Sequence, residues 1–191
     1  MRGRAGLVAV AAAVALAAGA AGCGSEGEGA GNPDSRAVDY DRALADAPAP
    51  LAELYAQGNE ILPGGLDAFE ARLEELRGYP VVVNKWASWC GPCRAEFPFF
   101  QAQAAKLGEE IAFLGIDAQD SDDAARTFLD ELPVPYPSYS DPDLEISREL
   151  EAQAEFPATV FFDAEGDRVY VHRGGYQDES DLVADIKRYA R

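Results

Sequence analysis

The fold is decided by residues 81–98, which read VVVNKWASWCGPCRAEFP. The first part, from Val81 to Trp86, is rich in β-branched and aromatic residues and is typical of a buried strand. Cys90 and Cys93 follow with two residues between them, and large apolar residues then recur at helical spacing. This stretch predicts a strand, a turn that carries the cysteines, and a helix.

A cysteine pair at the turn from a strand to a helix favours thiol–disulfide exchange. In that reaction a thiolate attacks a disulfide sulfur, and a second thiol nearby resolves the mixed disulfide. The start of a helix presents free N–H groups and partial positive charge, which lower the pKa of a thiol placed there. We therefore predict that Cys90 is the nucleophile and Cys93 the resolving thiol, with no cofactor beyond their redox-active disulfide.

Simpler interpretations of the pair compete with redox chemistry. A structural disulfide that closes so short a loop would add only ~2 kcal/mol of stability in the chain-entropy model. A zinc site needs about four ligands, and the chain offers a single histidine, His172, beside the pair. We expect His172 to be a structural or surface residue, and we expect no metal site.

On both sides of this stretch, the apolar pattern alternates between helices and strands. It predicts helices over 66–77, from about 93 to 107, and over 125–132, 142–150 and 182–189, and strands over 111–116, 136–140, 158–162 and 168–172. Asp141 and Pro142 are expected to form the N-cap and first turn of their helix. Together the elements indicate an α/β fold with a mixed central β-sheet and helices on both faces, in one domain over residues 65–191. Residues 37–64 are predicted to form a short helical extension.

The N-terminal region has the pattern of a secretory signal, with two arginines before a run of small and apolar residues. Residues 20–23, which read AAGC, resemble a bacterial lipobox, in which the cysteine is lipidated and becomes the mature N-terminus. We therefore predict a signal peptide over 1–22, and a lipidated Cys23 with a flexible tether over 23–36. Plain secretion and an uncleaved membrane anchor remain alternatives.

The composition excludes several classes of protein. The 191 residues include 34 acidic and 16 basic side chains, and the formal charge of −18 argues against nucleic-acid binding. Hydrophobic residues make up 48% of the chain, which argues against wholesale disorder. Three cysteines are too few for a disulfide-stapled scaffold.

Residues 86–98 are similar to the signature Trp-Cys-x-x-Cys-x-x-Glu-x-Pro, and the chain thereby resembles the thioredoxin superfamily. Within it, the chain resembles the TlpA/ResA-like extracytoplasmic thiol–disulfide oxidoreductases. The resemblance implies a thioredoxin-like fold over about residues 65–190, with residues 121–154 as the family's central insertion. Phe156 and Pro157, before the strand over 158–162, resemble the cis-proline loop of the superfamily.

The resemblance also implies roles for individual residues. Glu96 would manage protons at the cysteine pair. The surface that contacts a client would be formed by residues beside the pair and in the cis-proline loop, namely Trp89, Gly91, Pro92, Phe156 and Pro157.

Three positions depart from what is expected. Asn84 stands where cytosolic thioredoxins carry a buried aspartate, and a neutral amide cannot act as that proton acceptor. Phe156 is bulkier than the residue often found before the proline. Lys85 is unexpected in an otherwise apolar strand.

The implied function is that of a disulfide reductase at the extracytoplasmic face of a bacterial plasma membrane, tethered through Cys23. Its clients would be protein disulfides, such as those of the haem-site cysteines of apocytochrome c, and its electrons would come from a membrane thiol donor. A peroxiredoxin-like (AhpC/TSA-related) peroxidase is an alternative, although Val83 and Ala87 replace the proline and threonine that usually precede a peroxidatic cysteine. A non-catalytic module that holds apocytochrome or metal is another.

Overall fold

The computed structural model describes residues 39–191. The predicted signal peptide over 1–22, the lipidation site Cys23 and the tether to residue 36 lie outside the described residues, so these predictions remain untested.

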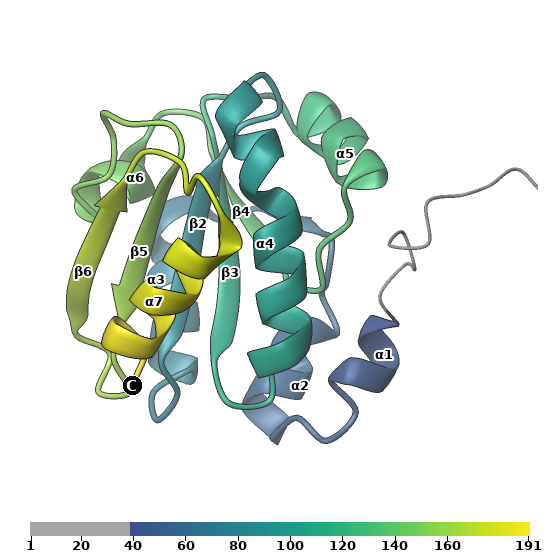
Figure 1. Ribbon diagram of the computed structural model, residues 1–191. Helices are drawn as coiled ribbons and strands as arrows, with labels where there is room; N and C mark the ends of the chain where they lie inside the picture. The colour runs from purple at the N-terminus through teal and green to yellow at the C-terminus, as the bar shows by residue number, and fades with distance from the viewer. Residues whose placement is uncertain (1–38) are drawn as a thin grey trace, which may run out of the picture. The chain divides into compact units, whose positions relative to one another are not determined.

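The centre of the fold is a six-stranded mixed sheet in the order β1-β4-β3-β2-β5-β6 (Figure 1). Its strands are β1 (Ile61–Leu62), β2 (Val81–Trp86), β3 (Ala112–Ala118), β4 (Ser138–Asp141), β5 (Ala158–Phe162) and β6 (Arg168–Arg173). The pairs β1–β4, β4–β3 and β3–β2 are parallel, whereas β5 pairs antiparallel with β2 and with β6. The predicted mixed sheet is therefore confirmed.

Helices cover both faces of this sheet. Apolar side chains of α4 (Gly91–Leu107), α5 (Asp122–Glu131) and α7 (Glu179–Tyr189) share one core cluster, and those of α2 (Ala49–Tyr55), α3 (Gly65–Glu75) and α6 (Glu145–Glu149) share the other. In Figure 1, α4 and α7 lie in front of the sheet, and α3 lies behind it. A short helix, α1 (Tyr40–Ala43), precedes them. None of the described helices is long and apolar enough to cross a membrane.

The end of β2 is fixed by the packing of Trp86. Its indole lies 5.3 Å from the ring of Phe97 on α4 and 4.9 Å from the ring of Phe128 on α5, measured between centroids. Its Nε1–H donates a hydrogen bond of 3.1 Å to the Ser138 hydroxyl on β4. Because the side chain is wholly buried, the strand end that leads into the cysteines is held to two helices and another strand.

Most predicted elements are confirmed, and most of the differences lie at their ends. Residues 61 and 62, within the predicted helical extension, instead form β1 and pair with β4. The helix predicted to begin near Cys93 begins two residues earlier, at Gly91. The strand predicted over 111–116 continues to Ala118.

The predicted N-cap role of Asp141 is wrong in its position, because Asp141 is the last residue of β4. Helix α6 begins later, at Glu145, after Leu144 in a left-handed conformation with φ of 60°. The Asp141 carboxylate nevertheless accepts hydrogen bonds from the amides of Ile146 and Ser147 and from the Ser147 hydroxyl. Capping thus comes from a side chain outside the helix and not from the adjacent residue.

Replacing Asp141 with Ala should lower the free energy of unfolding by about 2 kcal/mol, because two helix amides would lose a buried, charged acceptor. Urea unfolding with the disulfide kept oxidised measures the change. The exposed Asp143 supplies the matched control, since Asp143→Ala should change stability by less than about 0.5 kcal/mol. Equal losses in the two variants would contradict this capping role.

Candidate active site

The two cysteines form a disulfide at the start of α4, with their Cα atoms 5.3 Å apart. Cys90 is the N-cap of the helix, and its sulfur accepts a hydrogen bond of 3.1 Å from the Cys93 amide. The predicted strand, turn and helix around the pair are therefore confirmed. A sulfur in this position meets the free N–H groups of the helix start, which favour the thiolate form once the disulfide is reduced.

The two cysteines differ in accessibility. Cys90 retains 4% of its surface exposed, whereas Cys93 is wholly buried. Gly91 and Pro92 lie exposed between them, and a Cβ on Gly91 would meet no atom within 4 Å. This asymmetry supports the prediction that Cys90 meets the client and that Cys93 resolves the mixed disulfide.

Glu96 lies buried on the same helix, three residues after Cys93. Its carboxylate accepts hydrogen bonds from the Asn84 side-chain amide, at 2.8 Å, and from the Tyr176 backbone amide, at 3.0 Å. Burial raises the pKa of Glu96 to about 7, although both hydrogen bonds oppose that shift. Residues three apart on a helix share a face, so Glu96 is a buried acid that can exchange a proton near neutral pH beside the cysteine pair.

The loop before β5 contributes the second side of the site. The peptide bond between Phe156 and Pro157 is cis, as the resemblance implies. The Pro157 carbonyl accepts a hydrogen bond of 3.0 Å from the Gly174 amide. A Cβ on Gly175 would lie 3.5 Å from Pro157 and 3.6 Å from a carboxylate oxygen of Glu96. The turn after β6 therefore joins the cis-proline loop to the buried acid.

Aromatic side chains lie beside the turn that carries the cysteines. Trp89 is 58% exposed and is held by a hydrogen bond of 3.0 Å from its indole N–H to the Gln119 carbonyl. Its ring lies 4.8 Å from that of Phe156. A hollow of about 420 Å³, here called the docking hollow, is lined by Pro92, Ala95, Phe99, Phe156, Gly175, Tyr176 and Gln177. The structure thus brings the predicted contact residues Trp89, Pro92, Phe156 and Pro157 together, while Gly91 stays at the open side.

Tyr176 belongs to this site, although sequence reasoning missed it. Its hydroxyl donates a hydrogen bond of 2.9 Å to Asp185, and its ring stacks on His172 with centroids 4.0 Å apart. A nitrogen of His172 lies 3.2 Å from the same carboxylate. These contacts give His172 the structural position that was expected, because it packs against the residue whose amide binds Glu96. The glycines at 174 and 175 were the sequence signal that could have indicated Tyr176, because glycine allows the backbone to approach the site closely.

Asp117 is a second residue that the sequence did not single out. It lies on β3 opposite Trp86, only 1% exposed, and neither carboxyl oxygen has a hydrogen-bond partner among residues 39–191. Burial, together with the negative charges of Asp120 and Asp122, raises the pKa of Asp117 to about 8. The side chain is therefore neutral at pH 7 and adds no charge to this end of the sheet.

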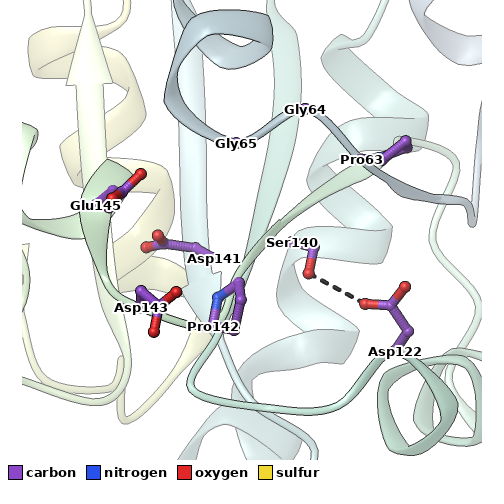
Figure 2. A pocket seen from close by; sticks show the side chains of 9 residues that line it. All are labelled: Pro63, Gly64, Gly65, Asp122, Ser140, Asp141, Pro142, Asp143 and Glu145. Atoms are coloured by element: carbon purple, nitrogen blue, oxygen red, sulfur yellow. Dashed lines mark hydrogen bonds between the residues drawn. The ribbon is translucent and has the colours of Figure 1, made fainter.

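Another hollow, of about 300 Å³, is lined by acidic residues at the ends of β4 and α5 (Figure 2). In it, the Ser140 hydroxyl donates a hydrogen bond of 3.1 Å to Asp122. The Asp141 carboxylate is already occupied by the amides of α6. From residue 39 onward, no group of three or more histidine, cysteine or acidic side chains is arranged to hold a metal ion.

The chain matches the AhpC/TSA family over residues 49–170, more than half of its length. The chain belongs to the AhpC/TSA family. Thiol-disulfide oxidoreductase ResA of Oceanobacillus iheyensis is 30% identical to it over 105 residues, which cover 53% of each chain. The thiol:disulfide interchange protein DsbE of Pseudomonas fluorescens biotype C is 37% identical over 94 residues, which cover 48% of this chain and 50% of DsbE. The chain spans about half the length of these curated relatives.

Solved structures establish the fold of this AhpC/TSA member. A thiol:disulfide interchange protein of the thioredoxin family from Chlorobium tepidum superposes with a TM-score of 0.54 and 24% identity. The match covers 61% of this chain and 83% of the other. The predicted thioredoxin-like fold is therefore confirmed.

Replacing Glu96 with Gln should remove a pH dependence of stability. The carboxyl pKa is about 7 when folded, against 4.5 for the free group, so the folded state holds its proton more tightly than the unfolded chain does. As pH rises from about 4.5 to about 7, the free energy of unfolding of the wild type should therefore fall relative to that of Glu96→Gln. The fall should reach up to ~3 kcal/mol, and the difference should stay constant above pH 7.

Urea unfolding of the oxidised proteins across this pH range measures the difference. The exposed Glu110 supplies the control, because Glu110→Gln should follow the wild type at every pH. A constant difference between wild type and Glu96→Gln would show that the Glu96 pKa is not raised.

Proposed function

We propose that this protein is an extracytoplasmic thiol–disulfide oxidoreductase that reduces disulfides of protein clients. The observation that carries the proposal is the Cys90–Cys93 disulfide at the start of α4, with Cys90 4% exposed and Cys93 wholly buried. The docking hollow near it is lined in part by the rings of Phe99, Phe156 and Tyr176, which suits an extended polypeptide client. The names of the ResA and DsbE relatives support the same reaction.

In the proposed reaction, the reduced protein meets a client disulfide. The Cys90 thiolate attacks one client sulfur, which forms a mixed disulfide and releases the other client sulfur as a thiolate that takes up a proton. Cys93 then loses its proton and attacks the Cys90 sulfur. This step restores the intramolecular disulfide and releases the second client thiol, so two electrons have passed to the client.

Glu96 is proposed to accept the Cys93 proton in the second step. With a pKa of about 7, its carboxyl is partly ionised at neutral pH and can both take and return a proton. Asn84 donates a hydrogen bond to one of its oxygens and holds the carboxylate in place. The amide thus positions the base, although it cannot itself act as one.

The reductive direction and the cellular position are parts of the same proposal. Gly91 and Pro92 between the cysteines resemble the dipeptide of reducing thioredoxins. A lipidated Cys23 would hold the protein at the outer face of a bacterial plasma membrane, where a membrane thiol donor would reduce the pair again. Protein disulfides, including those between haem-site cysteines of apocytochrome c, would be the clients.

A Cys93→Ala variant tests the oxidoreductase assignment, because Cys90 could form the mixed disulfide and nothing would resolve it. Incubation with extracytoplasmic extract should yield adducts that disappear on reduction, and mass spectrometry of the captured proteins would identify the clients. The double variant Cys90→Ala/Cys93→Ala should yield none. Equal capture by both variants would instead support a non-catalytic binding module.

The reduction potential tests the direction. We expect a value in the range of reducing thioredoxins, about −270 mV, when the pair is equilibrated with glutathione or dithiothreitol buffers. A value near about −120 mV, typical of a strong oxidant, would contradict the reductase assignment.

A peroxide reductase is the second candidate, because the chain belongs to the AhpC/TSA family and the peroxidase alternative is related to the same family. Val83 and Ala87 replace the usual proline and threonine before the cysteine. Both side chains are hydrocarbon and buried, so neither supplies a polar group to bind a peroxide. Rapid consumption of hydrogen peroxide by the reduced protein, lost in Cys90→Ala, would favour this candidate over the disulfide reductase.

A further inference from the structure

Lys85 is a buried cation in the central strand of the sheet. It lies on β2, where every residue from Val81 to Trp86 is buried, and its own exposed fraction is 0%. Within residues 39–191, no carboxylate lies within 4.0 Å of its ammonium group. The charge is therefore not held by an ion pair.

The partners of the ammonium all lie in one short segment before β5. Lys85 Nζ donates hydrogen bonds to the carbonyls of Ala152 and Glu155, each at 2.7 Å, and a longer one to Gln153 at 3.4 Å. It also lies 3.6 Å from the centroid of the Phe156 ring, within the range of a cation–π contact. A single side chain thus holds residues 152–156 at several points.

This arrangement is costly for the sheet. An ammonium group removed from water loses several kcal/mol of solvation, and apolar residues of similar volume often replace buried charges without loss of stability. Burial lowers the pKa of Lys85 to about 8, but the group remains charged at pH 7. An apolar residue could fill the same space, so what the ammonium adds is its hydrogen bonds and its cation–π contact with residues 152–156.

That segment ends at the client-contact surface. The Phe156 ring that contacts Lys85 also lies 4.8 Å from the Trp89 ring and lines the docking hollow. Pro157 follows directly. We propose that Lys85 is a positioning residue for client docking, which fixes Phe156 and the loop before it beside Trp89. The inference deepens the proposed function and rests on it.

Because Lys85 acts on the docking surface and not on the sulfurs, it should affect large and small disulfides differently. Lys85→Met keeps the length and removes the charge. With dithiothreitol as electron donor, its KM for insulin, a protein disulfide, should rise about tenfold, while kcat stays within about twofold, because the loop is no longer preorganised. Its rate with hydroxyethyl disulfide, which is too small to need the hollow, should match the wild type, and so should its reduction potential.

Lys106→Met is the matched control, because Lys106 is an exposed lysine on α4. It should leave both substrates unaffected. Phe156→Leu keeps the buried ammonium and removes the ring that it contacts, and it should raise the KM for insulin as well. In that background, Lys85→Met should add less than about threefold, because Lys85 acts through the ring.

Several results would overturn the inference. They are an unchanged KM for insulin in Lys85→Met, an equal loss on both disulfides, or a shifted reduction potential. If Lys85→Met does not fold, an unchanged KM in Phe156→Leu would overturn it. A wild type that reduces neither disulfide would defeat the proposed function itself, whereas an active wild type with an unaffected Lys85→Met would defeat this inference alone.

Discussion

The burial of Trp86 at the end of β2 is the contact on which the active end of the molecule depends. Its indole lies against the rings of Phe97 and Phe128 and donates to Ser138, so one side chain ties the strand to α4, α5 and β4. Four residues later the chain enters α4 through Cys90. Because the strand end cannot shift without disturbing two helices, the sulfur at the helix start has a fixed place relative to the cis-proline loop.

Around this anchor, the interior is more polar than a stable core requires. Glu96, Asp117 and Lys85 are each almost fully buried, and each would be solvated at lower free energy in the unfolded chain. Their compensation differs: Glu96 accepts two hydrogen bonds, Lys85 donates to carbonyls, and Asp117 remains uncharged at neutral pH. Such groups concentrate at sites where function outweighs stability.

The parts of the fold that follow from local pattern were predictable from the sequence. The strand from Val81 to Trp86 and the cysteine turn were predictable because apolar periodicity and the motif agree there. Helix α6 was misplaced, because its cap comes from Asp141 across a turn and not from the residue before the helix. The parts of the site that depend on distant contacts, such as the Tyr176 amide on Glu96 and the Lys85 ammonium on residues 152–156, could not be read from neighbours in the chain.

The deep position of the cysteine pair has a consequence for the kind of polypeptide that the site can serve. Because Cys93 is wholly covered and Cys90 is only 4% exposed, a partner sulfur must come close to the start of α4 to reach the pair. A disulfide held rigidly inside a finished domain cannot make that approach, whereas one in a loose stretch of chain can. If the protein acts as proposed, its choice of client would depend on how freely a disulfide can move out of the fold around it, as well as on the residues beside that disulfide.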